Sequence, residues 1–165
     1  MPIKRQEGEF DILYVSTTAP SGTPSPPEEE PSKYTRVGFV ADLGDELNNE
    51  ARSTTDREST THESVIYGTQ SSGFTMTCNV QEESAADATE EDAGQIDVRD
   101  ASINQTIVYW LIEPEDGNGT TVVGLERAYG SAIVESFSYT RNAGEFKQFE
   151  TTFTNREQPT YETTT

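Results

Sequence analysis

Residues that commonly perform catalysis or bind metals are scarce in this sequence of 165 residues, apart from carboxylates. The only histidine, His62, lies in a long polar segment, so we expect neither a histidine-based catalytic triad nor a multi-histidine metal site within one chain. Cys78 is the only cysteine, which excludes a disulfide within the chain. Its position on the apolar face of a predicted strand indicates a buried side chain rather than a reactive thiol.

Carboxylates are so abundant that no single pair of them is informative, although a glycosidase pair stays an alternative. The turn Asp116-Gly-Asn-Gly119 weakly resembles a calcium loop, but it lacks the spacing and the closing glutamate of an EF-hand. Neither a Gly-x-Gly-x-x-Gly motif nor a Gly-Lys-Ser/Thr phosphate loop occurs. We therefore expect no enzyme activity, no cofactor and no metal site.

The balance of 30 acidic against 11 basic residues gives a net charge of −19. Such a chain repels nucleic acids and anionic membranes. Excess carboxylate with only three lysines is typical of proteins that work in high salt, although an acidic protein from an ordinary host fits as well. No window approaches the roughly 18 apolar residues of a membrane span. The basic N-terminus precedes no apolar segment, so we expect a chain made in the cytoplasm without a secretory signal.

Alternating apolar and polar residues predict the strands that would position any site. The clearest strand covers residues 73–80, where Phe74, Met76, Cys78 and Val80 share one face. The continuous apolar run at 106–112 predicts a strand covered on both faces. Further strands are predicted at 10–17, 37–43, 121–139 and 149–153. In the third of these, a bulge near Glu135 would keep both halves facing the core.

One helix of about three turns is predicted between residues 82 and 105, lying on the edge of the sheet. Acidic residues at 90–92 would suit its N-terminus, and Ala93, Ile96 and Ile103 would share a face. The sequence thus predicts one domain, residues 1–165, that is mainly β. We expect an antiparallel β-sandwich or barrel of about seven or eight strands with one flanking α-helix and a long protruding loop.

Polar and proline-rich segments predict the connections. Residues 19–33 contain five prolines and indicate an exposed loop or arm. Residues 113–119 and 142–144 have the composition of turns, and residues 158–165 suggest a loose C-terminal tail. The segment 44–63 is almost entirely polar and predicts a long extended loop or a protruding hairpin.

The mixed charge of segment 44–63 suits reciprocal contacts between copies of one subunit, although a solvated loop fits equally well. The candidate inter-subunit residues are Glu50, Arg52, Asp56, Arg57, Glu58, His62 and Glu63. Aromatic residues within the predicted strands could instead form a sugar-binding platform, but core packing is the favoured interpretation. These residues are Tyr109, Trp110, Tyr129, Phe137, Tyr139, Phe149 and Phe153.

The order of these segments resembles that of the major tail tube proteins of long-tailed bacteriophages and related archaeal viruses. A polar loop at 52–63 precedes Ser72-Gly-Phe-Thr-Met-Thr-Cys-Asn-Val80, an acidic helix entry at Asp92-Ala-Gly-Gln95 and a strand. Tyr129-Gly-Ser-Ala-Ile-Val-Glu-Ser-Phe137, a turn and Phe149-Glu-Thr-Thr-Phe-Thr154 follow. The similarity covers about residues 52–155 and rests on element order rather than on an invariant motif. The proline-rich arm and the acidity depart from the family.

This resemblance implies a β-sandwich-type domain whose copies form hexameric rings, stacked into a hollow tube with a continuous β-barrel as its inner wall. The viral genome would pass through the tube without specific binding, because carboxylates facing the channel repel phosphates. The family also implies the virion tail as location, a loop at 44–63 that bridges neighbouring subunits, and tape measure, terminator and initiator proteins as partners. Two alternatives stay open: a carbohydrate-binding or adhesion module, and the tube protein of a contractile injection machine.

Overall fold

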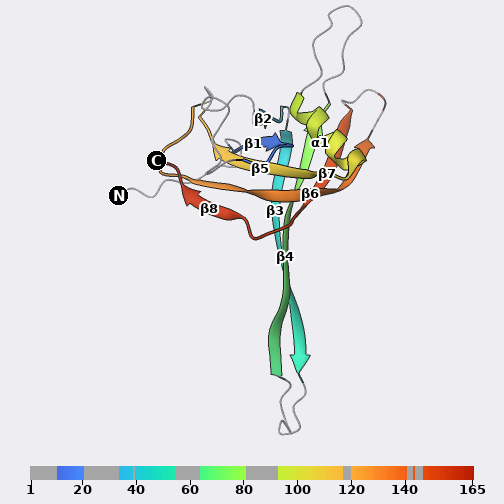
Figure 1. Ribbon diagram of the computed structural model, residues 1–165. Coiled ribbons are helices and arrows are strands. Elements are labelled where there is room, and N and C mark those ends of the chain that lie inside the picture. Colours follow the sequence, from blue (N-terminus) through green and yellow to red (C-terminus); the bar gives the residue numbers. More distant parts are fainter. Residues whose placement is uncertain are drawn as a thin grey trace, which may run out of the picture.

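The computed structural model describes residues 11–20, 34–38, 40–54, 64–80, 93–116, 120–140, 143 and 147–165, and gives the backbone alone for 42, 45, 46, 48–54 and 64–69. Eight strands and one helix form the described part of the chain (Figure 1). In chain order they are β1 (Asp11–Ser16), β2 (Thr35–Arg36), β3 (Val40–Thr54), β4 (Ser64–Asn79), α1 (Ala93–Asn104), β5 (Ile107–Pro114), β6 (Glu126–Thr140), β7 (Gln148–Asn155) and β8 (Thr160–Thr163).

All eight strands belong to one antiparallel sheet with the order β2-β1-β5-β6-β7-β4-β3. The eighth strand, β8, pairs with residues 126–129 of β6, while β7 pairs with residues 132–140 of that strand. The sheet curls, so that β5 and β6 run across the direction of β3 and β4 in Figure 1. The predicted mainly β fold with an antiparallel sheet and a single helix is confirmed.

The core lies on the inner face of the curled sheet. Phe74 stacks on Phe153 with ring centroids 4.3 Å apart and meets Trp110 edge-on at 5.0 Å. Phe74, Met76 and Cys78 are buried, as their alternation predicts. A second, smaller cluster of Tyr14, Tyr34 and Leu111 covers the opposite face of β1 and β5. The prediction that the apolar run of β5 is covered on both faces is therefore confirmed.

A bulge in β6 keeps its two halves on the same core. The pairing with β7 shifts register between Val134 and Ser136, so Glu135 is the extra residue. As a result Val134 and Phe137, which differ in phase, both pack against the core. The predicted bulge near Glu135 is confirmed.

A helix forms within the segment where the sequence predicts one, but the side of the helix that packs against the body differs from the predicted side. Its buried residues are Gly94, Gln95, Val98 and Ala101, whereas Ile103 is 70% exposed, so the predicted stripe through Ala93 and Ile103 is wrong. The helix packs across β6, β1, β2 and β5 rather than along one edge of the sheet. The predicted acidic residues at its N-terminus lie outside the described residues.

Backbone contacts explain the face that the helix presents. A Cβ atom on Gly94 would overlap the carbonyl oxygen of Arg36, so glycine permits the close approach of the helix to the segment after β2. The side-chain amide of Gln95 donates to the carbonyl oxygens of Gly38 at 2.8 Å and Asn79 at 3.0 Å. Polar contacts therefore hold the first turn of α1 in place. The spacing of apolar residues in the sequence cannot predict contacts of this kind.

Two segments predicted as irregular are strands. Glu113 and Pro114 belong to β5, so the turn predicted at 113–119 begins too early. Residues expected in a loose C-terminal tail form β8. Thr164 extends that attachment, because its N–H donates to the carbonyl oxygen of Leu125 at 2.8 Å and its hydroxyl donates to that of Val122 at 2.6 Å. The C-terminal residues are thus held by strand pairing, whereas their threonine-rich composition had predicted a loose tail.

Several predictions fall outside the described residues: most of the arm at 19–33, the segment 55–63 and most of the turn at 142–144. No helix in the described part of the chain is long and apolar enough to cross a membrane.

Candidate assembly surface

A two-stranded hairpin projects from the body of the molecule (Figure 1). It forms because β3 and β4 stay paired from Val40–Cys78 to Thr54–Ser64, whereas β7 pairs with β4 only over residues 73–79. Beyond Gly73 each strand therefore pairs only with the other within the described sheet. At about 3.3 Å per residue, residues 47–54 extend about 25 Å. We call this part of the molecule, residues 47–54 and 64–72, the projecting hairpin.

The projecting hairpin accounts for the first half of the segment predicted as a long loop or protruding hairpin. Glu50 lies at a register shift between Asn49 and Ala51, and Arg52 lies opposite Ile66. The other candidate contact residues lie outside the described residues: Asp56, Arg57, Glu58, His62 and Glu63. The structure thus places two of the seven candidates on the hairpin, and their role in subunit contacts stays a prediction.

Two-stranded hairpins are marginally stable in water without further packing. In addition, β3 is the last strand in the order of the sheet, so its outer edge has no strand partner among the described residues. Open edges of this kind pair readily with other chains. The projecting hairpin is therefore suited to contact a partner.

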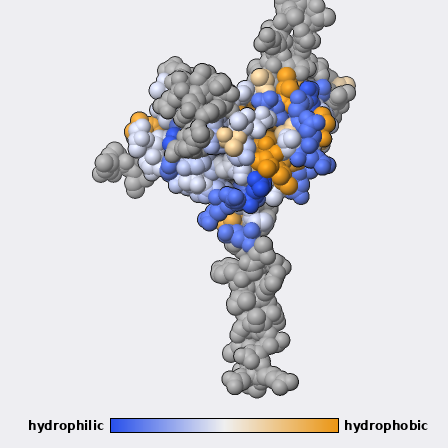
Figure 2. Space-filling view, in the orientation of Figure 1, coloured by the Kyte–Doolittle hydropathy of each residue, from blue (hydrophilic) through white to orange (hydrophobic). Residues whose placement is uncertain are grey.

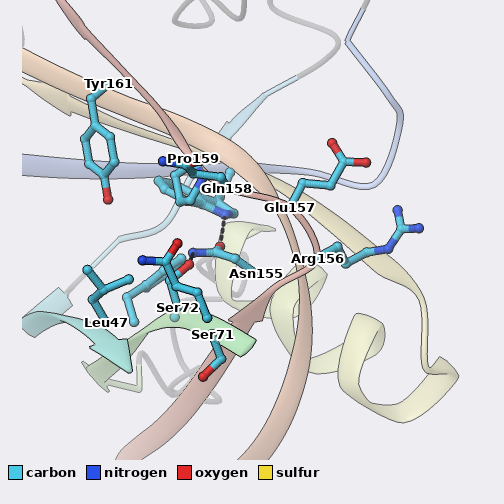
Figure 3. A pocket seen from close by; sticks show the side chains of 13 residues that line it. Leu47, Ser71, Ser72, Asn155, Arg156, Glu157, Gln158, Pro159 and Tyr161 are labelled. Atoms are coloured by element: carbon cyan, nitrogen blue, oxygen red, sulfur yellow. Dashed lines mark hydrogen bonds between the residues drawn. The ribbon is translucent and has the colours of Figure 1, made fainter. Parts of the chain in front are cut away.

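A cavity of about 430 Å³ lies at the root of the projecting hairpin, which we call the root pocket (Figure 3). It is bounded by β3, β4, the end of β7, the connection from β7 to β8, and Trp110 of β5. The lining residues are Leu47, Gln70, Ser71, Ser72, Gly73, Phe74, Trp110, Asn155, Arg156, Glu157, Gln158, Pro159 and Tyr161.

A chain of hydrogen bonds fixes the inner wall of the root pocket. The indole N–H of Trp110 donates to Oδ1 of Asn155 at 2.9 Å, and the amide of Asn155 donates to Oγ of Ser72 at 3.0 Å. This chain links β5, β7 and β4. Gly73 permits the close approach of β4 to β7, because a Cβ atom there would overlap the carbonyl oxygen of Phe153. The pocket is thus a preformed feature of the body.

Large apolar side chains flank the mouth of the root pocket. Leu47 of β3 is 61% exposed and Tyr161 of β8 is 55% exposed. Figure 3 shows both on one side of the pocket and the exposed residues Arg156 and Glu157 on the other. On the face that Figure 2 shows, apolar side chains form patches among hydrophilic ones over the body.

A buried charged cluster lies on the outer face, where β5 ends beside β6 and β8. The carboxylate of Glu113 is 1% exposed, and its Oε2 lies 3.7 Å from Nη1 of Arg127. Arg127 also donates to Glu162 of β8, at 2.6 Å from Nε. Burial raises the pKa of Glu113, and the guanidinium of Arg127 opposes that shift. One arginine thus neutralises carboxylates from two strands.

A tyrosine contact continues this cluster toward β1. The hydroxyl of Tyr14 donates to Glu115, and both side chains are buried. Burial and this hydrogen bond raise the pKa of Tyr14, so its phenol stays protonated. Among the described residues, no group of three His, Cys, Asp or Glu side chains is placed to hold a metal ion. The contacts of this cluster join β5 and the residue that follows it to β1, β6 and β8.

The aromatic residues considered for a sugar platform lie mostly inside the body. Trp110, Phe149 and Phe153 are buried, and Tyr139 alone among the seven is exposed, at 40%. Its ring contacts Phe137 edge-on at 4.9 Å, and the ammonium of Lys147 lies 4.7 Å from its centroid. This arrangement favours packing over an open stacking surface.

Sequence reasoning did not identify the root pocket. Leu47 is the only large apolar residue between positions 44 and 63, which was an available signal. Tyr161 gave no comparable signal, because its place beside the pocket depends on the return of β8 along β6.

No protein-family model matches the chain, and no curated protein matches it. Solved structures with a similar fold include the SPP1 tail tube, at a TM-score of 0.65 and 12% identity over 96% of this chain and 80% of that one. The tail of an empty gene transfer agent particle with C6 symmetry gives a TM-score of 0.62 and 12% identity, over 96% and 99% of the two chains. The sheath-tube complex of an extracellular contractile injection system, PVC, gives a TM-score of 0.61 and 13% identity, over 96% and 92%. At these identities the similarity establishes a shared fold.

Proposed function

We propose that this chain is a structural subunit of a viral tail tube, which polymerises as stacked hexameric rings around a channel for DNA. The observation that carries the proposal is the projecting hairpin. Its two strands extend beyond every other strand of the described sheet. Because an isolated two-stranded hairpin is only marginally stable in water, packing against a neighbouring molecule would stabilise it. The similar fold of the SPP1 tail tube supports the proposal over nearly the whole chain.

Sixfold rings are the arrangement we favour, because the gene transfer agent tail with the similar fold has C6 symmetry. In this proposal the chain resides in the virion tail and has a structural rather than a catalytic role. Tape measure, terminator and initiator proteins are its expected partners. The net charge of −19 lets DNA pass without binding, because a carboxylate-rich channel repels phosphates.

A second candidate is the tube of a contractile injection machine, which the similarity to the PVC sheath-tube complex favours. The two candidates differ in one partner, since a contractile machine surrounds its tube with a sheath. Purified particles that contain this chain inside a sheath would favour the second candidate. Particles with a bare tube would favour the first.

Negative-stain electron microscopy of the purified protein, at low and at molar salt, tests the proposal. We expect tubes or sixfold rings. Assembly only in molar salt would indicate that screening of the carboxylates is required, as in a protein from a high-salt host. Gold-labelled antibodies against the chain should also decorate broken tails of purified virions. Labelling confined to the capsid or to surface fibres would contradict the proposed function.

A further inference from the structure

We propose that the root pocket is a docking site for a second copy of this chain, which sits in the angle between the projecting hairpin and the body. This inference rests on the proposed function and specifies where neighbouring subunits meet. The second copy covers Leu47 and Tyr161 and places a carboxylate beside Arg156.

The geometry of the hairpin supports a second copy as the occupant. A neighbour that packs along the projecting hairpin and also touches the body must lie in the angle between them. The root pocket is at the vertex of that angle, between β3 and the connection from β7 to β8 (Figure 3). A copy placed there can also reach the outer edge of β3, which has no strand partner among the described residues.

The lining of the pocket suits an inserted segment of a protein chain. Leu47 and Tyr161 offer apolar surface at the mouth, and covering them removes that surface from water. Ser71 and Gln158 line the same space with a hydroxyl and an amide. These groups can donate to and accept from the backbone of an incoming segment. The pocket therefore combines an apolar rim with groups that satisfy a buried backbone.

The charges at the rim of the root pocket indicate where two acidic copies can contact each other. With 30 acidic and 11 basic residues, most surfaces of two copies repel each other. At the lip of the root pocket, however, the exposed Arg156 stands next to Glu157, so this rim presents a positive charge within an otherwise acidic surface. An arginine at this rim favours a carboxylate of the neighbour and fixes its position by paired hydrogen bonds.

Thiol labelling tests the proposal, because the native Cys78 is fully buried and does not compete for reagent. Leu47→Cys and Tyr161→Cys would each introduce one reactive thiol at the mouth. Val123→Cys is the matched control, since Val123 is 59% exposed. Labelling rates with a maleimide would be compared between the assembled and unassembled fractions of each variant, separated by sedimentation.

We expect assembly to slow labelling at positions 47 and 161 by at least about tenfold, and to slow it much less at position 123. Equal rates in the two fractions at 47 and 161 would overturn the proposal. Equal slowing at all three positions would also overturn it, because that result indicates general exclusion of the reagent by the particle. If neither mouth variant assembles, hydrogen exchange of residues 70–73 and 156–159 in wild-type particles gives the same comparison.

Arg156→Glu gives an independent measurement. We expect the reversed charge to raise the protein concentration needed for assembly at least about fivefold at low salt, and molar salt to remove most of that difference by screening. Unchanged assembly at low salt would contradict the placement of a carboxylate at Arg156. Wild-type protein that forms neither rings nor tubes would instead contradict the proposed function, so the two failures are distinguishable.

Discussion

The projecting hairpin and the body share β3 and β4, yet different forces stabilise them. Within the body, Phe74 and Met76 of β4 are buried against side chains from other strands. Beyond Gly73 the same strand pairs only with β3 within the described sheet. The body therefore gains its stability from apolar burial, whereas the described contacts of the outer hairpin are backbone pairs with the opposite strand.

This difference shows how one pair of strands can serve two purposes. The inner halves of β3 and β4 contribute to a core that one chain completes alone, and their outer halves leave an open edge and the β3 residue Leu47 exposed. Changes in the body should therefore alter the free energy of unfolding of the single chain. Changes in the hairpin should alter assembly.

The largest effect on stability is expected from Phe74→Ala. Phe74 is 1% exposed and contacts both Phe153 and Trp110, so its removal leaves a cavity. We expect a loss of about 3–5 kcal/mol in the free energy of unfolding, measured by chemical denaturation. Ile103→Ala is the exposed control and should change stability by less than about 0.5 kcal/mol. A loss below about 1 kcal/mol for Phe74→Ala would contradict the described core.

Arg127→Met should have the next largest effect. The substitution keeps the apolar stem but leaves the carboxylate of Glu113 buried without its cation. We expect a loss of about 3 kcal/mol at neutral pH, at the lower end of the range for broken buried pairs because the Arg127 side chain is 20% exposed. The double variant Arg127→Met with Glu113→Gln should recover most of this loss. No recovery would indicate that Arg127 acts through Glu162 alone.

Gly94→Ala should cost about 2 kcal/mol, because the added Cβ atom overlaps the backbone of Arg36 and forces α1 away from the sheet. Thermal unfolding followed by circular dichroism would measure the change. Ala93 is exposed at the adjacent position, so Ala93→Ser serves as a control with little effect. Increased stability of Gly94→Ala, as expected for a solvent-exposed helix position, would contradict the close docking of the helix.

Glu113→Gln should make stability less dependent on pH. Burial raises the pKa of Glu113 above its ordinary value of 4.5 in the folded state. Its contribution to stability is therefore greatest below pH 4.5 and declines as the pH rises through the folded-state pKa. Relative to wild type, Glu113→Gln should gain stability as the pH rises. A difference that does not vary between about pH 4 and pH 8 would contradict the raised pKa.

The smallest effect on single-chain stability is expected from shortening the hairpin. Replacing residues 50–69 by an Asn-Gly turn keeps the pair Asn49–Gln70 and removes the outer strands. The free energy of unfolding should change by less than about 0.5 kcal/mol, because every side chain of the described core is kept. Assembly into tubes should be abolished. Rings that still stack normally would show that the hairpin does not bridge subunits.

The body was largely predictable from the sequence, because burial leaves an alternating pattern within each strand. The strand containing Phe74 and the bulge at Glu135 follow from that pattern alone. Glu113 was misplaced in a turn, since its position in β5 is compatible with burial only through Arg127, a residue on another strand. The root pocket was missed because Tyr161 reaches it through pairing between distant segments. Contacts that depend on partners far along the chain leave no local pattern.

The continuity of β4 also has a mechanical consequence. This strand runs without interruption from the projecting hairpin into the centre of the body, where it pairs with β7 over residues 73–79. A pull along the hairpin therefore acts parallel to β7 and loads its hydrogen bonds with β4 in shear, so that they resist together rather than opening one after another. Tension from a neighbouring molecule would pass directly into the aromatic core, without crossing a loop that could absorb it.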